Sequence, residues 1–63
     1  MRTNRSYRIR KTKNTMIIEN EHGEHIAEYK FTSPTSALSD IRSMYRTIDD
    51  HIAKGGTLGN YQW

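Results

Sequence analysis

The stretch that decides the fold is residues 15–31, TMIIENEHGEHIAEYKF, in which two strand-like runs flank a glycine. The run TMIIEN is rich in β-forming residues, and HIAEYKF alternates apolar and polar residues, so each run indicates a strand. Gly23 supplies the positive φ that a tight hairpin needs, and we therefore place a two-residue turn at His22 and Gly23. The stretch predicts an antiparallel hairpin.

This turn fixes the register of the hairpin. Counting outward from it pairs Asn20 with His25, Glu19 with Ile26, Ile18 with Ala27, Ile17 with Glu28, and Met16 with Tyr29. Because directly opposed residues share a face of a sheet, one face of the hairpin is apolar. Its members are Met16, Ile18, Ala27, Tyr29 and Phe31. We expect this face to form the core.

A third strand is predicted before the hairpin, where the run YRIRK alternates apolar and basic residues. A similar turn at residues 13–14 pairs Ile9 with Ile18 and Tyr7 with Asn20. Both Tyr7 and Ile9 then join the apolar face. Two turns placed independently thus give one coherent core face.

A helix over residues 34–54 is predicted after the strands. Ser33 can cap it, and Pro34 suits its first position, where the missing N–H is not needed. The helix ends where Lys54 precedes two glycines, one of which suits a left-handed cap. One apolar stripe, flanked by Met44, runs along it and consists of Ala37, Leu38, Ile41, Tyr45, Ile48 and Ile52.

The predicted fold class is therefore α+β, with a three-stranded antiparallel β-β-β meander packed on one face by a single C-terminal helix. We expect one small domain over residues 1–63, divided into a basic arm (1–6), the sheet (7–31), the helix (34–54) and an apolar-aromatic tail (55–63). Tyr61 or Trp63 is expected to cover an edge of the core, the alternative being that the tail anchors a partner.

Composition excludes several classes of protein. The chain has no cysteine, so it forms neither disulfides nor thiolate metal sites. Its longest apolar run, MII, is too short for a membrane span or a secretory signal, and we expect a cytoplasmic protein with no membrane partner. The basic beginning has the composition of a transit peptide, but its removal would delete the strand YRIRK.

Residues with catalytic or metal-binding chemistry are present without a supporting arrangement. The segment ENEHGEH gathers Glu21, His22, Glu24 and His25, but the turn and the strand alternation spread these side chains, and a zinc site needs three or four convergent ligands. A third ligand would have to come from His51. No nucleophile, paired carboxylate or phosphate-binding glycine loop is apparent. We expect no enzyme activity, no metal and no cofactor.

Charge is distributed unevenly along the chain. Residues 1–14 carry six of the ten Lys and Arg residues and no acid, whereas residues 15–63 carry four basic and seven acidic residues, which gives −3. A basic arm on an acidic body suggests a nucleic-acid accessory protein that contacts phosphates. The candidate nucleic-acid-binding residues are Arg2, Arg5, Arg8, Arg10, Lys11 and Lys13.

The sheet face that the helix leaves uncovered offers an alternative function. The predicted register places Arg8 opposite Glu19 and Arg10 opposite Ile17 on this face, and the acids there oppose contact with phosphates. The candidate protein-partner residues are Ile17, Glu19, Ile26, Glu28 and Lys30. On this hypothesis the chain is a protein-interaction module or a small inhibitor of phage or mobile-element type, using this face, a strand edge or the tail. A homodimer, in which the partner is a second copy of this chain, is one such interaction.

Overall fold

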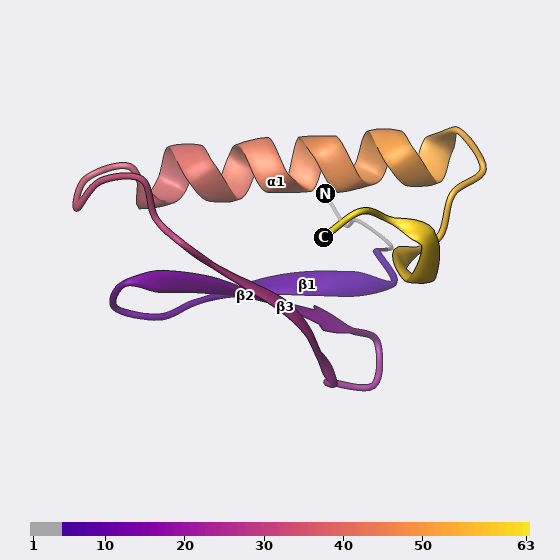
Figure 1. The fold of residues 1–63 in the computed structure, drawn as a ribbon, viewed down its shortest axis with the longest axis horizontal. Helices are drawn as coiled ribbons and strands as arrows, with labels where there is room; N and C mark the ends of the chain where they lie inside the picture. The colour runs from indigo at the N-terminus through magenta and orange to yellow at the C-terminus, as the bar shows by residue number, and fades with distance from the viewer. Residues whose placement is uncertain (1–4) are drawn as a thin grey trace.

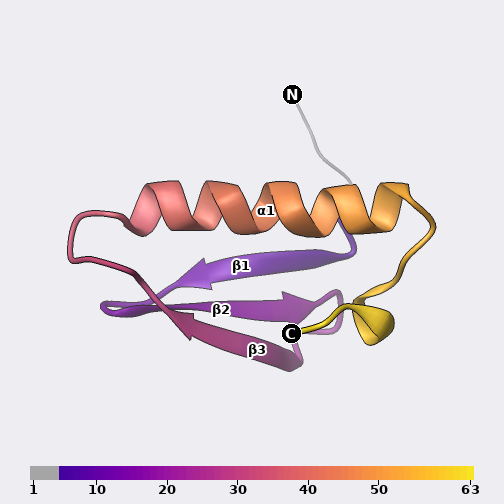
Figure 2. The ribbon, with the colours of Figure 1, turned by 45° about the horizontal axis from the view of Figure 1, so that its top comes forward.

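The computed structural model describes residues 5–63 as a three-stranded antiparallel sheet followed by one long helix (Figure 1). The strands lie in the order β1-β2-β3, and α1 crosses one face of the sheet (Figure 2). The predicted two-layer α+β fold is confirmed. The elements are β1 (Tyr7–Lys11), β2 (Thr15–Asn20), β3 (His25–Lys30), α1 (Ala37–Ala53) and a short 3-10 turn, η1 (Leu58–Asn60).

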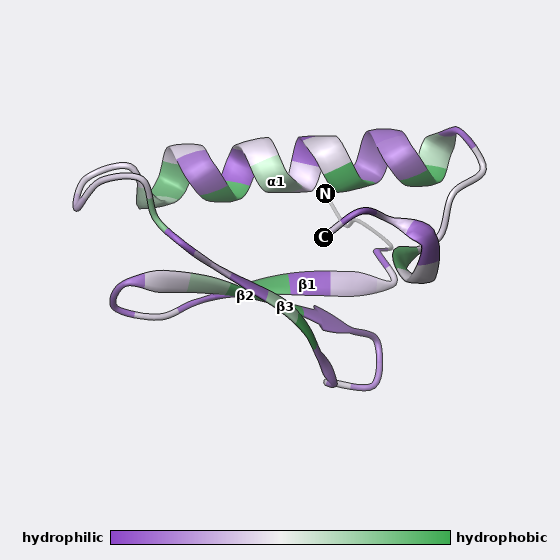
Figure 3. Cartoon of the chain, in the orientation of Figure 1, coloured by the Kyte–Doolittle hydropathy of each residue, from purple (hydrophilic) through white to green (hydrophobic). Residues whose placement is uncertain are grey.

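The core lies between α1 and the sheet. Ile18 of β2 and Ile48 of α1 are both 0% exposed, and Tyr7 and Met16 are also buried. Figure 3 shows hydrophobic residues on the side of α1 that faces the sheet. Half-buried residues that pack against Tyr7, Ile18 and Ile48 are Ile9, Ile26, Ala27, Tyr29, Met44, Tyr45, Ile52, Leu58 and Trp63. Burial of one Ile side chain contributes about 1.5–3 kcal/mol, so these few positions carry much of the stability.

The β1–β2 hairpin has the predicted register. Ile9 is paired with Ile18 and Tyr7 with Asn20. The Thr12 N–H donates to the Thr15 carbonyl at 2.9 Å, which leaves residues 13–14 as the predicted two-residue turn. This register brings Tyr7 and Ile9 to the core side of the sheet, as expected.

The tip of the β2–β3 hairpin corrects the predicted turn. The Asn20 N–H donates to the Glu24 carbonyl at 3.0 Å, and the Gly23 N–H donates to the Asn20 carbonyl at 3.0 Å. The loop therefore contains residues 21–23 rather than two residues. Gly23 has φ 82°, which fits the left-handed position of a three-residue hairpin loop.

A β-bulge next to this loop corrects the predicted partner of Glu19. Glu19 pairs with His25, and Ile18 pairs with Ala27, so Ile26 is an extra residue on β3. The longer loop and the bulge offset each other, and the register from Ile18 onward is the predicted one. Because a bulge interrupts the strict alternation of faces, Ile26 is half-buried and packs against the core cluster instead of standing on the open face.

The helix begins three residues later than predicted. The Ser36 N–H donates to the Ser33 carbonyl at 3.3 Å, so Pro34 lies inside a turn and Ser36, not Ser33, is the N-cap. Leu38 is a second correction, since it is 76% exposed. Ten residues at about 100° each place Leu38 about 80° around the helix from Ile48, at the edge of the apolar stripe.

The end of α1 matches the prediction of a glycine cap. Gly55 has φ 94°, its N–H donates to the Ile52 carbonyl at 3.0 Å, and the Gly56 N–H donates to the His51 carbonyl at 3.0 Å. These two bonds form a Schellman motif, which requires a residue in the left-handed region. The cap turns the chain back toward the sheet (Figure 2).

The tail docks on the core, as expected. The Tyr29 hydroxyl donates to the Trp63 carbonyl, and the Trp63 indole N–H donates to the Leu58 carbonyl at 3.0 Å. The His51 Nε2 lies 2.9 Å from the Thr57 carbonyl and 2.8 Å from the Asn60 Oδ1. These contacts hold both the η1 turn and the last residues against α1 and β3.

Candidate nucleic-acid interface

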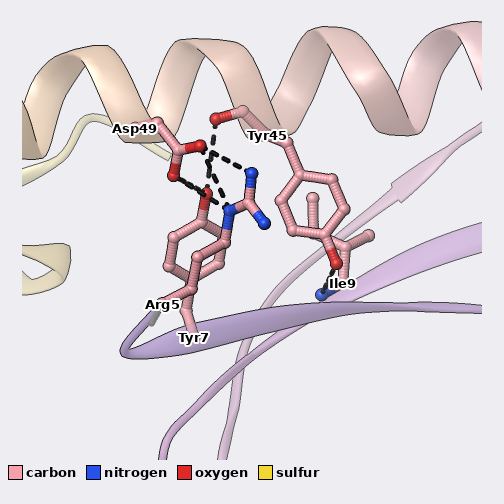
Figure 4. Close-up of polar contacts among 5 residues, drawn as sticks. All are labelled: Arg5, Tyr7, Ile9, Tyr45 and Asp49. Carbon is pink, nitrogen blue, oxygen red and sulfur yellow. Dashed lines mark hydrogen bonds and ion pairs between the residues drawn. The ribbon is translucent and has the colours of Figure 1, made fainter. Parts of the chain in front are cut away.

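Arg5, which the sequence assigns to the basic arm (1–6), is held on α1 (Figure 4). Its Nε lies 3.2 Å from Oδ1 and 3.1 Å from Oδ2 of Asp49, and its Nη2 lies 2.8 Å from Oδ2. The guanidinium also lies 4.4 Å from the centroid of the Tyr45 ring. Its charge is thus already matched by a carboxylate and an aromatic ring. Arg2 lies outside the described residues.

The same cluster joins β1 to the helix. The Tyr7 hydroxyl donates to the Asp49 Oδ1 at 2.5 Å and lies 3.3 Å from the Tyr45 carbonyl (Figure 4). The Tyr45 hydroxyl accepts the Ile9 N–H at 3.1 Å. Hydrogen bonds from Arg5 hold the pKa of Asp49 below its usual range, and burial raises the pKa of the Tyr7 hydroxyl. These residues stabilise the two-layer packing.

Arg8 and Arg10 share one buried carboxylate on the face of the sheet opposite α1. The Arg8 Nε lies 3.2 Å from Oε1 of Glu19, and the Arg10 Nη2 lies 3.2 Å from Oε2. Glu19 is only 7% exposed, so both oxygens of this carboxylate are engaged by arginines. The predicted pairing of Arg8 with Glu19 is confirmed by the register.

The rest of this open face also carries both apolar and charged side chains. Ile17 is half-buried opposite Arg10, and the exposed Glu28 lies 3.8 Å from the His25 Nε2. The carboxylates of Glu19 and Glu28 repel phosphates, which reduces the attraction that Arg8 and Arg10 exert from the same face.

Three lysines lie together at one end of the molecule. Lys11 ends β1, Lys13 is in the β1–β2 turn and Lys30 ends β3, and all three line a groove of about 390 Å³. We call it the lysine groove. Its other lining residues are Asn14, Phe31, Thr32, Ser33, Pro34 and Ala37. The lining contains no acid, and among the ion pairs within residues 5–63 none involves these lysines.

The sheet register explains this grouping. Lys30 is paired with Thr15, the first residue after the β1–β2 turn, and the Phe31 N–H donates to the Asn14 carbonyl at 3.1 Å. The end of β3 therefore lies against the turn that carries Lys13. The alternation of HIAEYKF predicts Lys30 among the protein-partner residues of the open face. Extending the predicted pairing of Met16 with Tyr29 by one residue would have brought it to the turn.

Asp40, in the first turn of α1, does not line the groove. Its Oδ2 accepts the Thr32 N–H at 2.8 Å and the Ser36 hydroxyl at 2.9 Å. These hydrogen bonds, the one from the Thr32 N–H foremost, hold the pKa of Asp40 below its usual range. The carboxylate is thus committed to fixing the β3–α1 loop, which forms one wall of the groove.

Within the described residues, a metal site and a membrane-spanning helix have less support than the lysine groove. Within residues 5–63 no three His, Asp or Glu side chains are placed to hold a metal ion. His22 lies near Glu21, with 3.9 Å between Nε2 and Oε1, whereas His51 is bonded to the tail. No helix in this part of the chain is long and apolar enough to cross a membrane.

Comparison with protein families, with curated proteins and with solved structures finds no match for this chain.

Proposed function

We propose that this protein is a small non-enzymatic binding module that contacts nucleic-acid phosphates through the lysine groove. The observation that carries the proposal is the meeting of Lys11, Lys13 and Lys30 around one acid-free groove. Lysine ammonium groups bind phosphates as compact point charges, and release of counterions from the nucleic acid makes such contacts favourable.

The proposal shifts the contact surface from the arm to the groove. Arg5, Arg8 and Arg10 were candidates from the sequence, but each lies beside a carboxylate of the same chain. An arginine already paired in this way gains less from a phosphate, because its existing ion pair must be given up. Lys11 and Lys13 remain from the predicted set, and Lys30 joins them.

The competing proposal is a protein partner on the open sheet face around Ile17 and Glu19. The half-buried Ile17 beside a fully engaged carboxylate favours it. The two proposals differ in which residues binding requires, and one measurement separates them.

The test is fluorescence anisotropy with short labelled duplex and single-stranded oligonucleotides at about 50 mM salt, where electrostatic binding is strongest. Three phosphate contacts predict a slope of log K against log[salt] of about −2.7 on duplex DNA and about −2 on single strands. The variant Lys11→Gln/Lys13→Gln/Lys30→Gln is expected to lose at least tenfold in affinity.

A matched control removes three cations elsewhere. Arg42→Gln/Arg46→Gln/Lys54→Gln has the same change in net charge, and none of these exposed residues of the helix and its C-cap lines the groove. The control is expected to lose no more than about threefold. Equal losses in the two variants would contradict a localised site. Absence of saturable binding at tens of micromolar protein would reject the nucleic-acid function in favour of the protein partner.

A further inference from the structure

We propose that the lysine groove takes single-stranded nucleic acid, with one unpaired base stacked on Phe31 and the adjoining phosphates on the lysines. This inference rests on the proposed function and adds the form of the ligand. It starts from the chemistry of the lining, which combines one aromatic ring with three cations. Stacked bases on aromatic side chains within a positive groove are the usual means of binding single strands.

Phe31 is available for this role. It is half-buried and lines the groove, and it lies outside the group of residues packed against Tyr7, Ile18 and Ile48. The predicted register assigns Phe31 to the core face. Its position one residue beyond β3 instead puts it at the junction of the sheet and the β3–α1 loop.

The arrangement of the charges fits a strand that enters the groove. Lys11 and Lys13 belong to the β1–β2 hairpin, whereas Lys30 directly precedes Phe31 on the neighbouring strand. Cations from two segments therefore accompany the aromatic ring. Asn14 and Ser33 add side chains that can hydrogen-bond to the edge of a base, whereas the Thr32 hydroxyl is already bonded to Asp40.

The shape of the site favours a single strand over a duplex. A groove of about 390 Å³ is at the scale of small-ligand sites, and it accommodates a group the size of one nucleotide. In a duplex each base face is already covered by its neighbours, so a paired base has no free face for Phe31. A duplex would contact only the lysines.

The test compares a twelve-nucleotide single strand, as DNA and as RNA, with a twelve-base-pair duplex and with an abasic strand of the same length. The wild-type protein should bind both single strands about tenfold more tightly than the abasic strand or the duplex. Phe31→Leu keeps an apolar side chain but removes the aromatic face. It should lower affinity for single strands about tenfold and leave the salt slope and the duplex affinity unchanged.

A spectroscopic readout tests stacking directly. Addition of the single strand should shift the ring protons of Phe31 upfield in the NMR spectrum, and the abasic strand should not. Thermal melting of Phe31→Leu shows whether the variant is folded; Phe31→Tyr, which keeps the aromatic face, should retain binding.

The outcomes separate this inference from the proposed function. Equal affinity for the intact and abasic strands, with no shift at Phe31, would overturn the stacking inference while lysine-dependent binding still supports phosphate contact. Loss of all lysine-dependent binding would overturn both. A Phe31→Leu effect on the duplex equal to that on the single strand would also overturn selectivity for single strands.

Discussion

The Tyr7 hydroxyl and the Asp49 carboxylate form a 2.5 Å hydrogen bond between residues 42 positions apart in the chain. Tyr7 belongs to β1 and Asp49 to the last third of α1, so this contact links the two layers directly. Arg5 binds the same carboxylate, with its Nε near both oxygens and its Nη2 2.8 Å from Oδ2. The cluster turns part of the basic arm into a support for the fold.

Removal of the Tyr7 hydroxyl should destabilise the protein. Tyr7→Phe keeps the buried ring but loses the bonds to Asp49 and to the Tyr45 carbonyl, and bonds to charged groups contribute about 1.5–3 kcal/mol. Urea unfolding should show a loss of about 1–3 kcal/mol. Tyr61→Phe is the control, because in residues 5–63 no hydrogen bond is made by the Tyr61 hydroxyl, and its loss should stay within about 0.5 kcal/mol. Similar losses in both variants would contradict the role of the cluster.

Stability should fall in acid, partly through Asp49. Its pKa is lower in the folded protein than the ordinary value of 3.8, so its contribution is complete above that value and is lost as pH falls through the folded pKa. Thermal melting from pH 5 to pH 2 should show a decline below about pH 4. Asp49→Asn should be less stable at pH 6 and should decline less steeply in acid, with Asp40 providing the remaining slope. If the melting temperatures of the wild type and Asp49→Asn declined in parallel as the pH fell, Asp49 would be excluded as a source of the acid sensitivity.

The helix face can be tested with two aliphatic residues of α1. Ile48 is 0% exposed, and Leu38 is 76% exposed. Ile48→Ala should cost about 2–5 kcal/mol because it leaves a cavity beside Ile18, whereas Leu38→Ala should stay within about 0.5 kcal/mol. Chemical unfolding of both variants measures the difference. A larger loss for Leu38→Ala would mean that α1 is rotated about its axis.

The bulge in β3 can be tested with two isoleucines of the sheet. Ile26 packs against the core cluster, and Ile17 lies on the open face. Ile26→Lys should therefore destabilise the protein more than Ile17→Lys, by about 1–3 kcal/mol, because an ammonium group replaces core contacts. Thermal melts of the two variants decide the point. If Ile17→Lys were the more destabilising variant, the register without a bulge would be the correct one.

Gly56 and His51 should behave as a coupled pair. A Cβ on Gly56 would lie 2.3 Å from the His51 Nε2, so Gly56→Ala must displace the imidazole and break its bonds to Thr57 and Asn60. The expected loss is about 1–2 kcal/mol. In a His51→Ala background the same substitution should cost little, and a double-mutant cycle measures the coupling. Additive losses would show that the imidazole does not occupy this position.

Much of the fold follows from the sequence because alternation and turn chemistry act locally. The β1–β2 register and the glycine cap of α1 are of this kind. The bulge at Ile26 does not follow from the sequence in this way. The extra residue in the loop and the extra residue in β3 compensate each other, so the pairing from Ile18 onward is the same with or without the bulge. The alternation in HIAEYKF therefore gives no sign of it.

The candidate site was less predictable for a different reason. The charge count identified a basic beginning, but whether a cation is free depends on its partners in the folded chain. Asp49 lies 44 residues from Arg5, and no sequence pattern connects them. Lys30, in contrast, could have been assigned to the groove from the register.

The Tyr45 hydroxyl at the Ile9 N–H limits how copies of this protein can associate. Ile9 is the middle residue of β1, an edge strand, and its N–H is the donor that a strand from another molecule would require there. Fibre growth by edge-to-edge pairing needs two accessible edges on every molecule. Because a helix side chain already occupies this donor, another strand could pair along β1 only by breaking the bond to Tyr45, which makes β1 a poorer template for such pairing than β3.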